Sequence, residues 1–161
     1  MEKERLLNEV KFTKEHFDRS TRVLKEEHSG HMPAPGMFTT AGQVTHVALT
    51  IDWFIDGATK PSGFNMDFAE HDRQARAAKS LTVSRKQLDK AFARLTDFIA
   101  SNTQAYLDAP MTAGPMMVGE PRYTIVMGIV EHTSHHRGAL TVYSRTLGLV
   151  PVMPYMEPQP A

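Results

Sequence analysis

The amino-acid sequence predicts an all-α domain built as a four-helix bundle. Four long segments carry apolar residues at steps of three and four, the spacing that places them on one face of an α-helix. No segment shows sustained alternation of apolar and polar residues, which is the pattern of a half-buried strand. Four amphipathic helices of this length can bury their apolar faces together around one core.

The first predicted helix runs from about Lys3 to His28. Its apolar stripe comprises Leu6, Val10, Thr13, Phe17, Ser20 or Thr21, and Leu24. Segment 29–36 ends this helix because its prolines and glycines oppose continuation.

The second predicted helix runs from about Ala41 to Gly57, with Thr39 or Thr40 as its N-cap. Its apolar face comprises Val44, Val47, Ile51, Phe54 and Ile55. Residues 58–80 are polar and contain a short helical turn at about 68–78.

Thr82 is the predicted N-cap of the third helix, which should end near Tyr106. Its stripe comprises Leu88, Phe92, Leu95, Phe98 and Ile99. Pro121 suits the first turn of the fourth helix, and Gly148 suits its end. The stripe of this last helix comprises Ile125, Ile129, His132, His136, Leu140, Tyr143 and Leu147.

The long connection between the second and third helices predicts the topology. It can return the chain to its starting end, so that these two helices run parallel in an up-down-down-up bundle. Residues 1–161 fit a single domain, with a Pro- and Met-rich extended tail at 150–161.

Composition narrows the class of function. The formal net charge is zero and there is no block of like charge, which argues against nucleic-acid and membrane-surface binding. The sequence has no apolar run of membrane-spanning length and no stretch of signal-peptide type, so we expect a cytoplasmic protein. Cysteine is absent, and any metal must therefore be bound by His, Asp or Glu.

His132 and His136 lie four residues apart on the stripe that should face the core. This separation brings two side chains within about 5–6 Å at Cβ, close enough to hold one metal ion. An unpaired polar group in such a place costs roughly 2–7 kcal/mol. The pair is therefore either a set of metal ligands or two core histidines that hydrogen-bond to neighbouring carboxylates or carbonyls.

His46, in the middle of the second helix, is the best candidate for a third ligand. Three neutral imidazoles leave a coordination position open, as in catalytic rather than structural metal sites. Nitrogen donors favour zinc or nickel, with iron or manganese as further candidates, over magnesium or calcium.

These residues resemble the DinB/YfiT-like family, a superfamily of metal-binding four-helix-bundle proteins. The resemblance is carried by His46, by the run from Glu131 to Gly138, which contains His132, His136 and Arg137, and by the order of the helices. It implies a divalent metal on His46, His132 and His136, and a homodimer. Some relatives are thiol S-transferases that use low-molecular-weight thiols, and others are assigned as metal-dependent hydrolases or isomerases.

Several polar residues are candidates for roles around such a metal. Metal-bound histidines usually donate their second ring N–H to a carboxylate or carbonyl. The candidates are Glu131, Asp52, Glu70, His71, Tyr143 and Arg137. Trp53, seven residues after His46, could form the wall of a pocket. His135 lies about 100° around the helix from His136, and we expect it to make a helix–helix contact, a subunit contact or a hydrogen bond to Glu131.

The leading hypothesis is a metal-dependent enzyme acting on a small molecule. The metal would lower the pKa of a bound water or thiol, which fits hydrolysis or thiol transfer. Because the chain has no cysteine, the thiol must come from a cosubstrate. The alternatives are a non-catalytic metal- or ligand-binding bundle and a metal-free interaction protein with paired core histidines.

Overall fold

The computed structural model describes residues 1–156, and these contain six α-helices and one short 3₁₀ helix. The elements are α1 (Lys3–Thr21), η1 (Glu26–His28), α2 (Thr40–Thr59), α3 (Phe68–Ala77), α4 (Leu81–Ser101), α5 (Gln104–Asp108) and α6 (Thr124–Thr146). Over this range the only β pairing is an isolated bridge between Pro110 and Pro121. The all-α prediction is confirmed.

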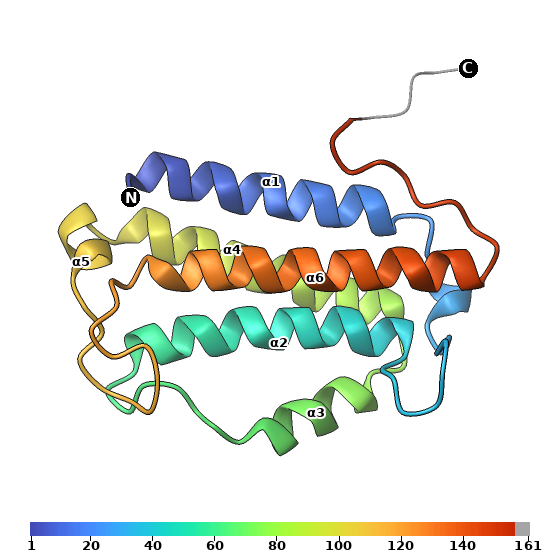
Figure 1. The fold of residues 1–161 in the computed structure, drawn as a ribbon, viewed down its shortest axis with the longest axis horizontal. Helices are drawn as coiled ribbons and strands as arrows, with labels where there is room; N and C mark the ends of the chain where they lie inside the picture. Colours follow the sequence, from blue (N-terminus) through green and yellow to red (C-terminus); the bar gives the residue numbers. More distant parts are fainter. Residues whose placement is uncertain (157–161) are drawn as a thin grey trace.

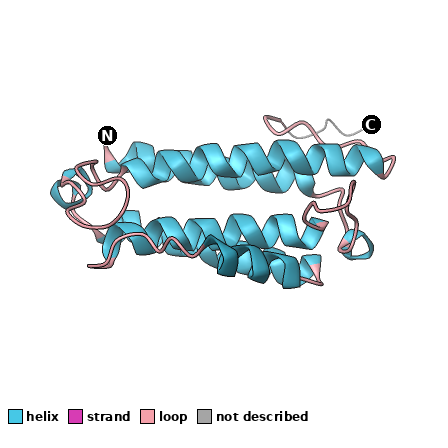
Figure 2. Cartoon of the chain, turned by 60° about the horizontal axis from the view of Figure 1, so that its bottom comes forward, coloured by secondary structure: helices cyan, strands magenta, loops and turns pink. Residues whose placement is uncertain are grey.

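The four long helices α1, α2, α4 and α6 lie side by side. Both α1 and α2 contact α4 and α6. Helices α1 and α6 run in one direction and α2 and α4 in the other (Figure 1). Most of the connecting loops lie at the two ends of the molecule, whereas segment 60–67 runs along the bundle to α3, which packs against α2 on the outside (Figure 2).

The predicted apolar stripes face a common core. Its members come from all four long helices and include Leu6, Val10, Phe17, Val44, Val47, Ile51, Leu88, Leu95, Ile99, Ile125, Ile129 and Leu140. Phe54 departs from this pattern, because it is only partly buried and lies at the edge of the core. Within residues 1–156, no helix is both long enough and apolar enough to cross a membrane.

The first helix ends at Thr21, so the prediction that it continues to His28 was wrong. The residues after it instead form hydrogen bonds with the first residues of α4. The Ser29 hydroxyl accepts a hydrogen bond from the Leu81 N–H at 2.8 Å, and the Glu26 carboxylate accepts one from Thr82 at 2.7 Å. These long-range contacts satisfy N–H groups that an isolated helix would leave unpaired.

The third long helix differs from its prediction at both ends. Ser80, rather than Thr82, is its N-cap, with its hydroxyl accepting from the Val83 N–H at 3.2 Å. The helix ends at Ser101, and Thr103 caps the separate short helix α5, which contains Tyr106. Local capping by a hydroxyl therefore divides what the apolar stripe predicted as one helix.

The last helix begins at Thr124, and the prediction of Pro121 in its first turn was wrong. Pro121 instead forms the bridge with Pro110, and its carbonyl accepts from the Thr124 N–H. The predicted end is confirmed, because Gly148 has a φ of 75° and its N–H bonds to the Arg145 carbonyl. Of the predicted tail, residues 157–161 lie outside the described part of the chain.

Candidate metal centre

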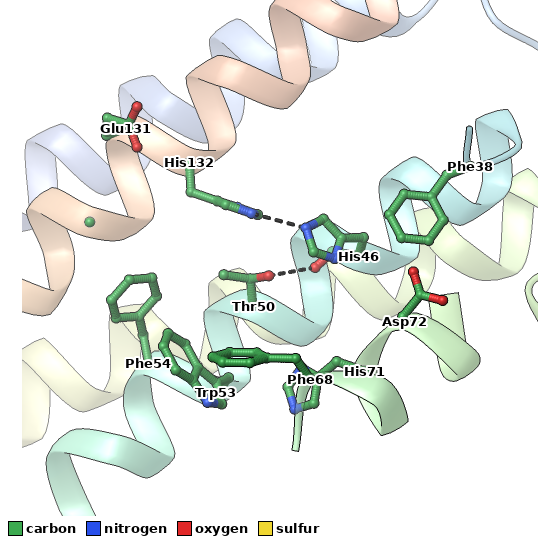
Figure 3. A pocket seen from close by; sticks show the side chains of 11 residues that line it. Phe38, His46, Thr50, Trp53, Phe54, Phe68, His71, Asp72, Glu131 and His132 are labelled. Atoms are coloured by element: carbon green, nitrogen blue, oxygen red, sulfur yellow. Dashed lines mark hydrogen bonds between the residues drawn. The ribbon is translucent and has the colours of Figure 1, made fainter. Parts of the chain in front are cut away.

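Helices α2 and α6 bring His46, His132 and His136 together. The ring centroids lie 5.0 Å apart for His46 and His132, 4.8 Å for His46 and His136, and 4.4 Å for His132 and His136. One nitrogen from each ring can be chosen so that all three lie within 4.8 Å of one another. Figure 3 shows His132 pointing from α6 across to His46 on α2. The three residues singled out in the sequence thus form one cluster.

The distance between two of the nitrogens fits a shared ion. The Nε2 atoms of His132 and His46 are 3.1 Å apart. Two nitrogens bound to one tetrahedral zinc, each at about 2.0–2.1 Å, are separated by about 3.3 Å. A metal ion between them would use both lone pairs, whereas a direct hydrogen bond needs a proton on one of the two atoms.

A buried chain of hydrogen bonds orients His136. The Tyr143 hydroxyl donates to the Phe38 carbonyl at 2.8 Å and accepts from the Gln43 amide nitrogen at 3.0 Å. This fixes the Gln43 amide oxygen toward His136, where it accepts from Nδ1 at 2.6 Å. With the proton on Nδ1, the Nε2 lone pair of His136 is free to bind a metal.

Protein groups do not satisfy all the nitrogens of the cluster. His46 Nδ1 is buried and has no hydrogen-bond partner within residues 1–156. Within the described part of the chain, the Nε2 atoms of His46 and His132 bond only to each other, and no carboxylate joins them. The interpretation as core histidines satisfied by their neighbours thus accounts for His136 but not for the other two. The donor set as a whole fits a divalent ion.

The surroundings keep the imidazoles neutral. Burial lowers the pKa of His132 to about 4 and that of His136 to about 3, and repulsion from the neighbouring histidines adds to the effect. Burial also lowers the pKa of His46. Neutral imidazole is the form that binds metals, so the cluster is ready for an ion at neutral pH.

The metal-free protein should lose stability as the pH falls below about 6.5, where unfolded histidines take up protons. Folded His132 resists protonation until about pH 4, so unfolding takes up protons in this window. Urea denaturation at a series of pH values would measure the loss. Replacing both His132 and His136 with Gln should make the free energy of unfolding depend less on pH. An unchanged dependence would contradict the claim that these two buried, neutral histidines cause the loss of stability.

A hollow of about 540 Å³ adjoins the cluster, between α2, α3 and α6 (Figure 3). It is lined by Phe38, His46, Thr50, Trp53, Phe54, Phe68, His71, Asp72, Gly128, Glu131 and His132. Two of the three clustered histidines therefore face this pocket. A small molecule in the pocket would lie next to them.

The other candidate residues fall into two groups. Trp53 forms part of the pocket wall, as predicted, and Glu131 and His71 also line the pocket. Asp52 forms an ion pair with Arg94 at 2.7 Å, away from the histidines. Glu70 is bonded to Arg73, its neighbour on the exposed side of α3.

Three further candidates touch the site indirectly or lie outside it. Tyr143 reaches His136 through Gln43 rather than directly. The His135 ring lies 4.9 Å from that of His136, its neighbour on α6, a contact within one helix that tests none of the roles predicted for it. The Arg137 guanidinium lies over the Tyr155 ring, 5.9 Å from its centroid.

Sequence reasoning missed Gln43 and Gly128. Gln43 lies three residues before His46 and so on the same face of α2, a spacing that could have drawn attention to it. A Cβ atom at Gly128 would lie 2.7 Å from Phe54 Cζ, so the glycine makes room for this ring at the pocket. The contact joins α6 to α2, so the residues around Gly128 in the sequence do not predict it.

Replacing Tyr143 with Phe should break the hydrogen-bond chain behind His136. The Gln43 amide and the Phe38 carbonyl would each lose a partner, at an expected cost of about 1–3 kcal/mol in the free energy of unfolding. Chemical denaturation would measure this loss, and metal titration should show a weaker affinity. Tyr106→Phe is the matched control, because Tyr106 lies on α5, away from the histidines.

Comparison with known proteins agrees with this fold. A search of curated proteins finds no match. Among solved structures, a crystal structure of a Streptococcus pneumoniae protein is similar with a TM-score of 0.72 and 16% sequence identity, covering 90% of this chain and 91% of that one. This likeness concerns the fold. The sequence profile of the DinB family matches residues 1–160. The chain belongs to the DinB family.

Proposed function

We propose that this protein is a DinB-family metalloenzyme that holds one divalent ion on His46, His132 and His136. The observation that carries the proposal is the convergence of three neutral imidazoles at the wall of a pocket. A divalent ion held there would lower the pKa of a bound water or thiol and generate a nucleophile at neutral pH. The substrate is a small molecule, and the reaction is thiol transfer or hydrolysis.

The donor set supports a site that stays open to a ligand. Within residues 1–156, no fourth His, Asp or Glu joins the three histidines. His46 and His132 line the pocket, so an ion on them is accessible to a small molecule. Catalytic zinc sites commonly combine three protein ligands with one exchangeable position.

The chemistry of the donors also limits the metal and the cosubstrate. Three imidazoles favour zinc or nickel, followed by iron or manganese. The chain has no cysteine, so a thiol nucleophile is supplied as a low-molecular-weight cosubstrate. Gln43 contributes by fixing the proton of His136 on Nδ1, which keeps Nε2 available.

We also propose the finer order of the fold and the assembly. The opposed directions of the α1/α6 and α2/α4 pairs support an up-down-down-up four-helix bundle, with 60–80 as the crossover (Figure 1). Family membership supports a homodimer, and a monomeric mass by light scattering would contradict it. We propose that the protein acts in the cytoplasm. The zero net charge is in line with a function that involves neither nucleic acid nor a membrane surface.

A second candidate function is a bundle in which the ion is purely structural. The three histidines come from two helices, His46 from α2 and His132 and His136 from α6. An ion bound to all three would hold these helices together, which favours the structural role. In that case the coordination shell would be closed to added ligands.

Cobalt substitution of tag-free protein tests these functions. Titration with N-acetylcysteine, with N-acetylserine as the matched alcohol, should produce a sulfur-to-cobalt charge-transfer band with the thiol alone if the enzyme transfers thiols. A hydrolase should instead show cobalt bands that shift with pH as a bound water ionises. A spectrum unaffected by thiol and by pH would support the structural role. Failure to bind cobalt would overturn the metal site itself.

A further inference from the structure

The pocket beside the histidines contains a cluster of aromatic rings. The Trp53 ring lies 5.0 Å from that of Phe54 and 5.9 Å from that of Phe68, centroid to centroid. Trp53 is held in place by its Nε1–H, which donates to the Asn65 carbonyl at 2.6 Å, and by the buried Phe64 ring at 4.7 Å. The three rings that line the pocket therefore form a preformed apolar wall, in which the N–H of the tryptophan is already bonded.

The histidines and the rings lie at different levels of the same pocket. Trp53 follows His46 by seven residues on α2, a rise of about 10 Å along the helix axis. Thr50 lines the pocket between them, and its hydroxyl donates to the His46 carbonyl at 2.9 Å. Figure 3 shows the rings gathered together, apart from His46. A molecule that contacts both ends therefore has to span about two helical turns.

The rings are not part of the buried core. Trp53 and Phe54 are half-buried and Phe68 is 54% exposed, whereas Phe64 behind them is 3% exposed. Apolar surface on the three rings is thus left open to a hollow of about 540 Å³, an ordinary size for a site that takes a small organic molecule. Covering this surface with an apolar group would remove it from water, which favours binding.

Positive charge in this pocket is concentrated at the proposed ion. A divalent ion on His46 and His132 would attract the electron-rich atom of a ligand, such as a thiolate sulfur or a carbonyl oxygen. The lining contains neither Lys nor Arg, and its carboxylates, Asp72 and Glu131, are drawn apart from the rings in Figure 3. The ion therefore anchors the polar end of a ligand, and the rings contact a part that needs no charge.

We infer that the substrate is an elongated small molecule, with an uncharged apolar or aromatic group about two helical turns from the atom that meets the ion. This group lies against Trp53, Phe54 and Phe68. A compact polar molecule would leave the three rings uncovered. The inference rests on the proposed function, because it names the substrate class of the same pocket.

Trp53 is the single tryptophan of the chain, so its fluorescence reports directly on the pocket. The probes are the hydroxamates of γ-phenylbutyric acid, butyric acid and benzoic acid, which bind zinc through the same group. The butyryl probe is the phenylbutyryl probe without its ring, and the benzoyl probe holds its ring next to the ion. The phenylbutyryl probe should bind the zinc-loaded protein at least about tenfold more tightly than the butyryl probe, as expected for burying most of an aromatic ring.

Phe68→Ala assigns this gain to the aromatic wall. The variant should weaken the phenylbutyryl probe by about fivefold, the size expected for the loss of one aromatic contact, and leave the butyryl and benzoyl probes unchanged. Because Phe68 is 54% exposed at the start of α3, its replacement should leave the fold intact. Phe12→Ala is the matched control, since Phe12 is 50% exposed on α1, and it should affect none of the probes.

Zinc content is measured separately, and phenylbutanol, which lacks the zinc-binding group, is titrated into the zinc-free protein. Bound zinc together with equal affinity for the phenylbutyryl and butyryl probes would overturn the inference and leave the proposed function standing. So would a gain that survives unchanged in Phe68→Ala. A protein that fails to bind zinc, yet binds phenylbutanol more tightly than its Phe68→Ala variant does, would overturn the proposed function and support the aromatic part of the site.

Discussion

Replacing His132 with Ala should lower the zinc affinity of the protein by more than about 100-fold, beyond the 10–100-fold typical of losing a residue that only supports a ligand. His132 supplies the Nε2 atom that lies 3.1 Å from its counterpart on His46, at the centre of the cluster. The two remaining imidazoles are a weak site for any divalent ion. Competition titration with a chromophoric chelator would measure the change.

His135→Ala is the matched control for this experiment. It removes an imidazole from the same turn of α6, and its ring touches His136, but it is exposed and lies outside the ligand group. It should therefore bind zinc like the unmodified protein. Equal affinity of His132→Ala and His135→Ala would contradict the assignment of His132.

Replacing Gln43 with Leu should reduce zinc affinity by about 10–100-fold, although Gln43 is not a ligand. The variant removes the oxygen that accepts a hydrogen bond from His136 Nδ1 at 2.6 Å. Without this bond, the proton is no longer held on Nδ1, and Nε2 is no longer kept free for the metal. The same change leaves the Tyr143 hydroxyl without its donor, so the free energy of unfolding should also fall. Zinc titration and urea denaturation would measure the two effects.

Gln43→Glu separates the orientation of His136 from general loss of packing. Glutamate keeps an oxygen for His136 Nδ1, so zinc affinity should stay near that of the unmodified protein, while the bond to Tyr143 changes. If Gln43→Leu bound zinc as tightly as Gln43→Glu, Gln43 would have no part in orienting the ligand.

Much of the fold could be predicted because the core helices carry their own pattern. The stripes through Leu6 and Phe17 on α1 and through Ile125 and Leu140 on α6 are buried as the three-four spacing requires. The same spacing placed His132 and His136 on the inner face. Periodicity is informative where one face of a long helix is buried along its whole length.

The helix ends could not be predicted in the same way, because distant residues decide them. The chain leaves α1 at Thr21 so that Glu26 and Ser29 can bond to the first turn of α4, more than fifty residues away in the sequence. The spacing of apolar and polar residues near Thr21 does not predict a contact with such a distant part of the sequence. The division between α4 and α5 at Thr103 is local, but the apolar stripe masks it.

The pocket was the hardest feature to foresee. Its outer wall comes from α3, a polar helix of which Ala75 is the one buried residue. Phe68 and Asp72 reach the site because α3 packs against α2, an arrangement that depends on the tertiary fold. Gln43, in contrast, lies one turn from His46 and could have been tested as its neighbour.

The most direct test of the three-histidine centre is X-ray absorption spectroscopy of the tag-free protein loaded with zinc, combined with elemental analysis. We expect one zinc per chain, with three imidazole nitrogens at about 2.0–2.1 Å and a further light-atom ligand from solvent. Loss of one imidazole from the spectrum of His46→Ala would identify the ligand on α2. Substoichiometric zinc, or a shell with fewer than three imidazoles, would contradict the account.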